Sequence, residues 1–412
     1  MRRRTGKPAV TDWTPQLFTP YPDHPDVVMA RIAARSAAFG ATSAAGGAPV
    51  LVGSATGHRR ERVAAGARGE LLERLGNVMA GREAEAAAET VGTLAELREA
   101  GHPVLEPKVR PDARRLWVRG RTVRGADVLV AASSVFLQHR PPPRCEGVPA
   151  VGSTGVAAHP DPTAAIRHAA WEVLERDLVR RSWYGLDPQP PVRLTTRVPS
   201  PLAELILAQQ LVATAFRVPA PTGAVCAVVC LHRPDGSGQT FGARCGPATA
   251  VPALVETAAY EALMVRWSMD TPVARRTWDQ WHGSSPPTTA VQHALWAYHR
   301  QDSLRLWGVR THERPRDRDT PYRPRRFTSA LPDGPTDRRA AAPGETDAFT
   351  DPAGTGPDPL ALLARHTGRE VITVETTAKP ARDAGVRVVR VLAPGAGPLP
   401  SRTDSGPPHP FG

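Results

Sequence analysis

The sequence GSTGVAAHPDPTAAIRHAAWEVLERDLVRRSWY, from Gly152 to Tyr184, decides the fold. A turn of small residues leads through two prolines into a long helical pattern, for which Asp161 is a suitable N-cap and Pro162 a suitable first residue. Glu172 and Glu175 are three residues apart and therefore project from nearly the same side of this helix. An apolar face is supplied by Ile166, Ala169, Ala170, Val173, Leu174 and Leu178.

The two carboxylates repel each other at this spacing, so the helix gains nothing from them unless a cation lies beside them. A solvated face, offset by Arg176 and Arg180, is the simpler interpretation of a single pair, because charged residues are mostly at the surface. The sequence contains a second pair of this kind, however. Glu70 and Glu73 repeat its spacing in a second helical pattern, and each pair is followed directly by an arginine, Arg74 in this case.

A third acidic helix is predicted over Pro252–Trp267, in which Glu261 is followed by Arg266. Turns rich in small residues precede the three helices, including the segment 53–60 before the first. Three acidic helices with this common arrangement indicate one shared site, and a metal ion is the cation that such a site suggests.

Helical and extended patterns alternate along the rest of the chain. Strands are expected at 49–54, 116–123, 128–136, 223–231, 370–377 and 386–395, and further helices at 26–39, 84–101 and 201–216. Interleaved helices and strands predict an α/β or α+β fold, with helices packed on mixed sheets.

We expect an N-terminal approach segment over residues 1–48 and one large domain over 49–412. Within this domain, residues 311–359 are crowded with Pro, Arg, Asp, Gly and Thr and carry too few apolar side chains to offset the entropy of ordering. They predict a disordered insertion. Residues 398–412 are expected to form a proline-rich tail.

The chain has 412 residues and a formal charge of +12, which permits a nucleic acid as partner. We expect none, because the sequence has no RNA-binding signature and no zinc-finger spacing. Four cysteines do not form a disulfide framework in so long a chain, and Cys226 and Cys230 are best interpreted as buried thiols. No signal peptide or membrane span is evident, so we expect a cytoplasmic protein without a membrane partner.

These motifs resemble, in their order and spacing, those of the YcaO family, whose members bind ATP and magnesium without a Walker motif. The resemblance rests on GELLER at 69–74, STGVAA and AAWEVLERD within 153–177, and VETAAYEALMVR at 255–266. VRVVRVLAPG at 386–395 and the final PPHPFG at 407–412 extend it. The resemblance implies ATP and Mg²⁺ as cofactors, and the absence of a P-loop signature from the chain agrees with it.

By position, the resemblance implies that the metal-carrying acids are Glu70, Glu73, Glu172, Glu175 and Glu261. It implies nucleotide contacts from Ser153, Thr154, His58 and Arg176. Arginines near the acids can pair with phosphate oxygens or neutralise the carboxylates, and the candidates are Arg74, Arg176 and Arg266. Azoline-forming members end in a proline-rich run near the active site, to which Pro408 and Pro410 correspond.

In the family, a nucleophile attacks a backbone carbonyl, the amide oxygen is phosphorylated, and phosphate leaves. The resemblance implies a cyclodehydratase that makes thiazoline or oxazoline rings from Cys, Ser or Thr residues of a ribosomal precursor peptide. A separate leader-peptide-binding partner, related to ubiquitin-activating enzymes, is expected, and a homodimer is left open. Two alternatives remain: the same chemistry with another nucleophile, giving a thioamide or a macrocyclic amidine, and a non-catalytic scaffold subunit.

Overall fold

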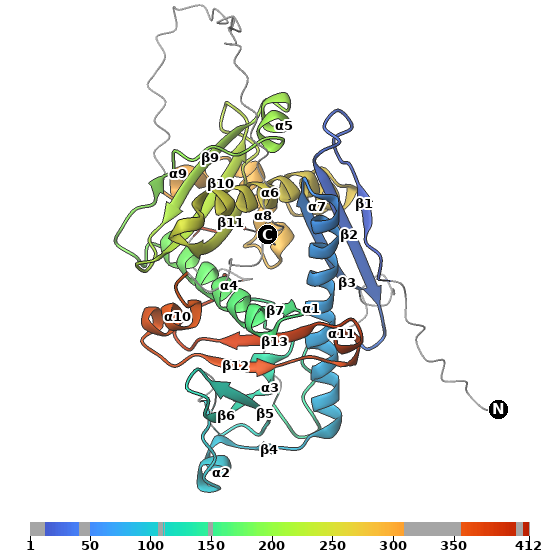
Figure 1. The fold of residues 1–412 in the computed structure, drawn as a ribbon, viewed down its shortest axis with the longest axis vertical. Helices are drawn as coiled ribbons and strands as arrows, with labels where there is room; N and C mark the ends of the chain where they lie inside the picture. The colour runs from blue at the N-terminus through green and yellow to red at the C-terminus, as the bar shows by residue number, and fades with distance from the viewer. Residues whose placement is uncertain are drawn as a thin grey trace, which may run out of the picture.

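The computed structural model describes residues 13–40, 50–105, 110, 112–146, 151–308, 356–400 and 407–411. These residues form three sheets of antiparallel strands with helices between and around them, which confirms the expected mixed fold. Figure 1 shows the four-stranded sheet at the top, the six-stranded sheet below it and the three-stranded sheet at the side.

The N-terminal segment contributes two strands of the three-stranded sheet. The order is β1 (Gln16–Phe18), β2 (Val28–Arg35) and β3 (Val50–Gly57). The helix expected at 26–39 is wrong, because from Ala30 onward exposed residues of β2 alternate with buried ones, as in a half-buried strand. The turn expected from Gly53 is also strand, since β3 pairs with β2 as far as Gly57.

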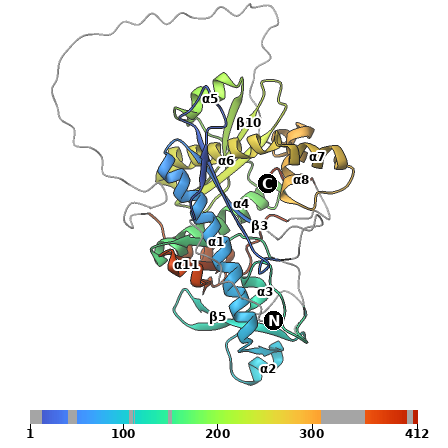
Figure 2. The same cartoon turned by 90° about the vertical axis from the view of Figure 1, so that its right-hand side faces the viewer.

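α1 (Arg60–Ala87) follows β3 and packs against this sheet. Figure 2 shows it crossing from the three-stranded sheet towards α2. The single helix expected at 84–101 is wrong: α1 ends at Ala87, and β4 (Val91–Gly92) and α2 (Leu94–Glu99) follow. Thr93 begins α2 because it forms a capping box with Glu96.

The six-stranded sheet combines strands from both ends of the chain. Its path is β4, β5 (Arg115–Thr122), β12 (Ile372–Glu375), β13 (Arg387–Leu392) and β7 (Val156–His159), and β6 (Asp127–Ala131) pairs with β5. The two late strands are confirmed. So is the early strand pair, although β6 runs into the short helix α3 (Ala132–Val135). α11 (Lys379–Asp383) connects β12 to β13.

The four-stranded sheet has the order β11 (Thr240–Pro247), β10 (Ala224–His232), β9 (Val212–Val218) and β8 (Val192–Arg193). β10 is buried throughout because Val228 and its even-numbered neighbours share a core with α4, while Val229 and its odd-numbered neighbours share one with α6. Cys226 and Cys230 are buried free thiols, as expected. The second half of the helix expected at 201–216 is wrong, since α5 (Leu202–Ala208) ends before β9 begins.

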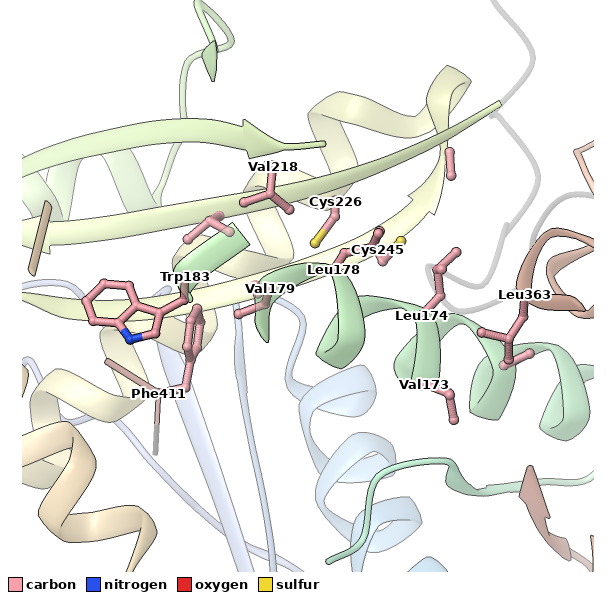
Figure 3. Close-up of a cluster of buried hydrophobic side chains, with 14 of the residues drawn as sticks. Val173, Leu174, Leu178, Val179, Trp183, Val218, Cys226, Cys245, Leu363 and Phe411 are labelled. Atoms are coloured by element: carbon pink, nitrogen blue, oxygen red, sulfur yellow. The ribbon is translucent and has the colours of Figure 1, made fainter. Parts of the chain in front are cut away.

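α4 (Pro162–Trp183) lies between the four-stranded and six-stranded sheets. It begins as the sequence predicts, with Asp161 as N-cap accepting a hydrogen bond from the Thr163 N–H. Figure 3 shows its apolar side below β10 and β11. α6 (Val251–Met269) follows a 3₁₀ turn (Ala248–Ala250) and covers the opposite face of that sheet. The remaining helices are α7 (Pro272–Trp281), α8 (Ala290–Arg300), α9 (Ser303–Leu306) and α10 (Pro359–Thr367).

Two expected segments fall partly outside the described residues. Of the insertion expected at 311–359, residues 356–359 are described, and Pro359 already belongs to α10. Of the tail expected at 398–412, residues 398–400 and 407–411 are described, and Pro408–Phe411 is buried. Among the described residues, Ala248–Met269 is long and apolar enough to cross a membrane by those two criteria, but it packs here on β10 as a core helix does.

Candidate active site

The first and third acidic helices touch their preceding strands in the same manner. A Cβ added to Gly53 of β3 would lie 2.1 Å from the Ala67 carbonyl oxygen of α1. One added to Gly242 of β11 would lie 2.1 Å from the Ala258 carbonyl oxygen of α6. Glycine is required at both positions because the helix backbone occupies the space of any side chain. This close approach lets a helix side chain reach the backbone of the strand.

A glutamate from each of these helices binds the residue that follows the glycine. The Ser54 N–H donates to Glu70 Oε2 at 2.5 Å, and the Ala243 N–H donates to Glu261 Oε2 at 3.1 Å. Both carboxylates are therefore fixed to a strand by one oxygen. About 30% of the Glu70 side chain and 31% of the Glu261 side chain remain exposed, so both also have an open side.

α4 supplies two glutamates and links two sheets through them. The Gly155 N–H, just before β7, donates to Glu172 Oε2 at 3.0 Å. The Cys245 N–H of β11 donates to Glu175 Oε2 at 3.0 Å. Glu175 is the more enclosed of the two, with 3% of its side chain exposed. The second oxygen of Glu175 faces Arg176 rather than backbone.

Arg176 lies where α4 meets α6. Its Nε is 3.5 Å from Glu175 Oε1, and its Nη2 is 3.8 Å from Glu261 Oε1. Burial acts to lower the pKa of Arg176, but the charges of Glu175, Glu261 and Glu172 outweigh it and raise this pKa above its usual value. Arg176 is thus held positively charged among acids from two helices.

The carboxyl groups of the three helices are close enough to affect one another's ionisation. Burial raises the pKa of Glu73 well above its usual value, and the charges of Glu172 and Glu70 raise it further. Burial is also the first cause of the raised pKa of Glu172, Glu175 and Glu261. The structure therefore brings the five glutamates into one cluster. Without an added cation, ionising Glu73, Glu172, Glu175 and Glu261 together is costly.

The donor set suits magnesium held together with a nucleotide. Mg²⁺ prefers oxygen ligands and is usually bound by one or two carboxylates plus water and phosphate oxygens. In the described part of the chain, no group of three or more His, Cys, Asp or Glu side chains is placed so that it could hold a metal ion by itself. A buried Nε of Arg390, without a hydrogen-bond partner among the described residues, adds a donor near the acids.

Three of the other residues expected to contact the nucleotide lie near this cluster. Ser153 and Thr154 form the turn before β7, where the Ser153 carbonyl accepts a hydrogen bond from the Val156 N–H. Both precede Gly155, which binds Glu172. Arg74 pairs with Glu70, with 2.6 Å between Nη2 and Oε1. Their roles as nucleotide contacts stay predictions.

His58 and Arg266 have contacts elsewhere. The His58 Nδ1 lies 3.2 Å from the Tyr260 hydroxyl oxygen and 3.3 Å from Glu256 Oε1. Arg266 donates from Nη1 to the Gly238 carbonyl oxygen at 2.7 Å. In this structure the two side chains therefore bind the surroundings of α6 and not the five glutamates.

Sequence reasoning missed two arginines that act on the cluster. The charge of Arg244 on β11 acts against the raised pKa of Glu73, Glu175 and Glu261. The Arg244 Nη2 lies 2.6 Å from His168 Nε2. Arg390 of β13 donates from Nη1 to the Gly152 carbonyl oxygen at 2.8 Å. Burial lowers the pKa of Arg390 to about 10, although Glu172 and Glu73 act to raise it. An arginine inside an apolar strand is the sequence signal that could have identified either one.

The proline-rich tail ends beside the cluster. Pro408 and Pro410 are buried, and the charge of Arg176 acts on His409 between them. The tail is therefore docked in the fold. Whether Pro408 and Pro410 organise the site stays a prediction.

Comparison with known proteins places this geometry in a family. Residues 54–397 match the model of the YcaO cyclodehydratases, described as ATP- and Mg²⁺-binding. No curated protein matches the chain. The fold is similar to that of YcaO from Methanopyrus kandleri bound with AMPPCP and Mg²⁺, at 18% identity and a TM-score of 0.57, over 97% of this chain and 91% of that one.

Two further solved structures have a similar fold. One is a heterocyclase in complex with substrate and cofactor, at 18% identity and a TM-score of 0.63, over 95% of this chain and 51% of that one. The other is the E. coli microcin synthetase McbBCD complex with pro-MccB17 bound, at 11% identity and a TM-score of 0.52, over 89% of this chain and 84% of that one. The family match covers most of the sequence and includes the five glutamates. The chain therefore belongs to the YcaO family of ATP- and Mg²⁺-dependent cyclodehydratases.

Proposed function

We propose that this cyclodehydratase forms thiazoline or oxazoline rings in a ribosomal precursor peptide. A Cys, Ser or Thr side chain loses its proton and bonds to the preceding carbonyl carbon, and the former amide oxygen accepts the terminal phosphoryl group of ATP, which leaves ADP. The C–O bond then breaks, phosphate leaves, and loss of the amide proton gives the C=N bond of the ring. Phosphorylation is needed because an amide oxygen is a poor leaving group and phosphate is a good one.

The convergence of carboxylates from α1, α4 and α6, with Arg176 among those of α4 and α6, is the observation that supports this function best. We assign Glu70, Glu73, Glu172, Glu175 and Glu261 to hold Mg²⁺, which stabilises charge on the transferring phosphoryl group when bound. Arg176, Arg244 and Arg390 lie near enough to this cluster to offset phosphate charge.

We also infer that a separate protein presents the precursor peptide. The likeness of fold to a chain of the microcin synthetase complex, whose structure contains pro-MccB17, supports this inference. A leader-peptide-binding partner would leave the site free to act on successive residues of the peptide that follows the leader.

Incubation of the full chain with Mg²⁺, ATP and a candidate precursor peptide rich in Cys, Ser and Thr tests the proposal, with and without a candidate partner. We expect peptide-dependent phosphate release and the loss of one water per ring by mass spectrometry. In a parallel incubation with added sulfide, exchange of oxygen for sulfur in the peptide would assign the chain to thioamide formation instead. If Glu175→Gln released phosphate as fast as the wild type, the assignment of Glu175 to the Mg²⁺ site would be contradicted.

A further inference from the structure

The end of the C-terminal tail is buried between helices and the four-stranded sheet. The Trp183 Nε1–H of α4 donates to the Pro407 carbonyl oxygen at 3.2 Å. Phe411 is 1% exposed, and its ring centroid lies 5.8 Å from that of Trp307 and 6.1 Å from that of Phe241. Figure 3 shows Phe411 beside Trp183. The last residues of a chain are usually poorly ordered unless other parts of the fold hold them in place, as these contacts do here.

Between Pro407 and Phe411, the tail contributes one ring of a stacked pair of imidazoles. The rings of His409 and of His293 on α8 are parallel within 4°, and their centroids are 3.7 Å apart. His293 is fully buried, and 5% of His409 is exposed. Two buried rings at this separation pack well when both are uncharged and repel each other when both are charged.

The hydrogen bonds of His409 require its neutral form. Its Nε2–H donates to the Pro400 carbonyl oxygen at 2.9 Å, and its Nδ1 accepts from the Phe411 N–H at 3.4 Å. His293 donates from Nδ1 to the His409 carbonyl oxygen at 3.3 Å. A proton added to Nδ1 of His409 would remove the acceptor that holds Phe411.

The surroundings oppose a positive charge on His409. Burial, then His293 and Arg176, lower the pKa of His409 to about 3, against the hydrogen bond to Pro400. The elements packed against the tail face it with Trp183 and Arg176 from α4, His293 from α8, Phe241 from β11 and Trp307. Of these, Arg176 is charged and His293 is titratable.

We infer that His293 and His409 form an uncharged anchor that holds the C-terminal tail against α4 and releases it on protonation of His409. Only an effect of tail release on catalysis would rest on the proposed function, since the charge of Arg176 acts on His409 and Arg176 also lies beside Glu261. The direction of the pH dependence follows from the ionisation of His409 in the docked and in the released tail. A released His409 titrates at about pH 6.5, so the opening equilibrium begins to rise near that value and rises about tenfold per pH unit below about pH 5.5.

Exchange of the Trp183 indole hydrogen in D₂O, followed by NMR on the full chain, measures this opening without using ATP chemistry. The indole signal is assigned with Trp183→Phe, and deletion of residues 407–412 gives the exchange rate of the open state at each pH. We expect the deletion to accelerate exchange at pH 7.5. We also expect opening of the wild-type tail to increase about fivefold from pH 6.5 to 5.5 and about tenfold from pH 5.5 to 4.5.

His409→Phe is the matched variant, because it keeps a ring that can stack on His293 and keeps the backbone carbonyl that His293 binds. Its opening should not change with pH. Equal exchange rates in the wild type and the deletion would show that the tail does not protect Trp183. Equal pH dependence in the wild type and His409→Phe would show that His409 is not the sensitive group. Either result would overturn the anchor and leave the proposed ring-forming activity untouched.

Discussion

The two sides of α4 have opposite chemistry within one helix. One side buries Leu174 and Leu178 against β10 and its neighbours, where each apolar group removed from water stabilises the fold. The other side carries Glu172, Glu175 and Arg176, whose burial costs free energy that is recovered in part by mutual attraction and backbone hydrogen bonds. The comparison indicates that stability and activity are separable by substitutions one residue apart.

The largest effect on activity is expected from Glu175→Gln. Removing this charge should lower Mg²⁺-dependent ATP turnover by about a hundredfold or more, because a carboxylate assigned to hold Mg²⁺ is lost. The Cys245 N–H keeps an acceptor in the amide oxygen, so the fold should persist. Turnover and thermal unfolding measured on the same preparation check both halves of this expectation.

Leu174→Ala, its immediate neighbour, should have the reverse effect. Leu174 is fully buried, and truncation should cost about 2–5 kcal/mol of the free energy of unfolding through lost burial and a residual cavity. Chemical denaturation gives this value. At a temperature where the variant is folded, its turnover should stay near that of the wild type; loss of turnover equal to that of Glu175→Gln would show that the two sides are not separable.

Arg390→Gln should weaken nucleotide binding by about tenfold, since it removes a cation from the acid cluster and leaves a polar side chain. Binding of ATP with Mg²⁺, measured by calorimetry, provides the test. Arg387→Gln is a suitable control, because Arg387 lies on the same strand, is exposed, and pairs with Glu375. A similar loss of affinity in both variants would contradict a specific role for Arg390.

Glu73→Gln should stabilise the metal-free protein by about 1 kcal/mol at neutral pH. The pKa of Glu73 is raised in the fold, so its contribution is favourable below about pH 4.3, the unfolded value, and is lost as the pH rises through the folded value. The advantage of Gln should therefore vanish towards acid pH. Unfolding curves at several pH values without Mg²⁺ test this; a variant less stable than the wild type at neutral pH would be inconsistent with crowded carboxylates.

The smallest effect is expected from His58→Ala. Because His58 contacts Tyr260 and Glu256 and not the five glutamates, turnover should change by no more than about twofold. Steady-state kinetics with ATP settle the point. A tenfold rise in KM would restore His58 to the nucleotide site and show that it moves on binding.

Features that depend on residues close together in the sequence were predicted correctly. Asp161 and Pro162 begin α4, and the spacing of Glu172 and Glu175 places both on one side of it. β2 was missed because Arg31 and Arg35, four residues apart, also fit one face of a helix. The segment is a strand because it pairs with β3. Arg244 and Arg390 reach the cluster through sheet pairing between distant segments, and the binding of Glu175 to the Cys245 N–H depends on the same tertiary contact. Such contacts have no local signal.

A crystal structure of the full chain with Mg²⁺ and a non-hydrolysable ATP analogue tests the central claim most directly. We predict that the ions are bound by carboxylates from α1, α4 and α6 together, with the phosphates facing Arg176. A nucleotide bound elsewhere, or ions contacting the carboxylates of one helix alone, would contradict the shared site.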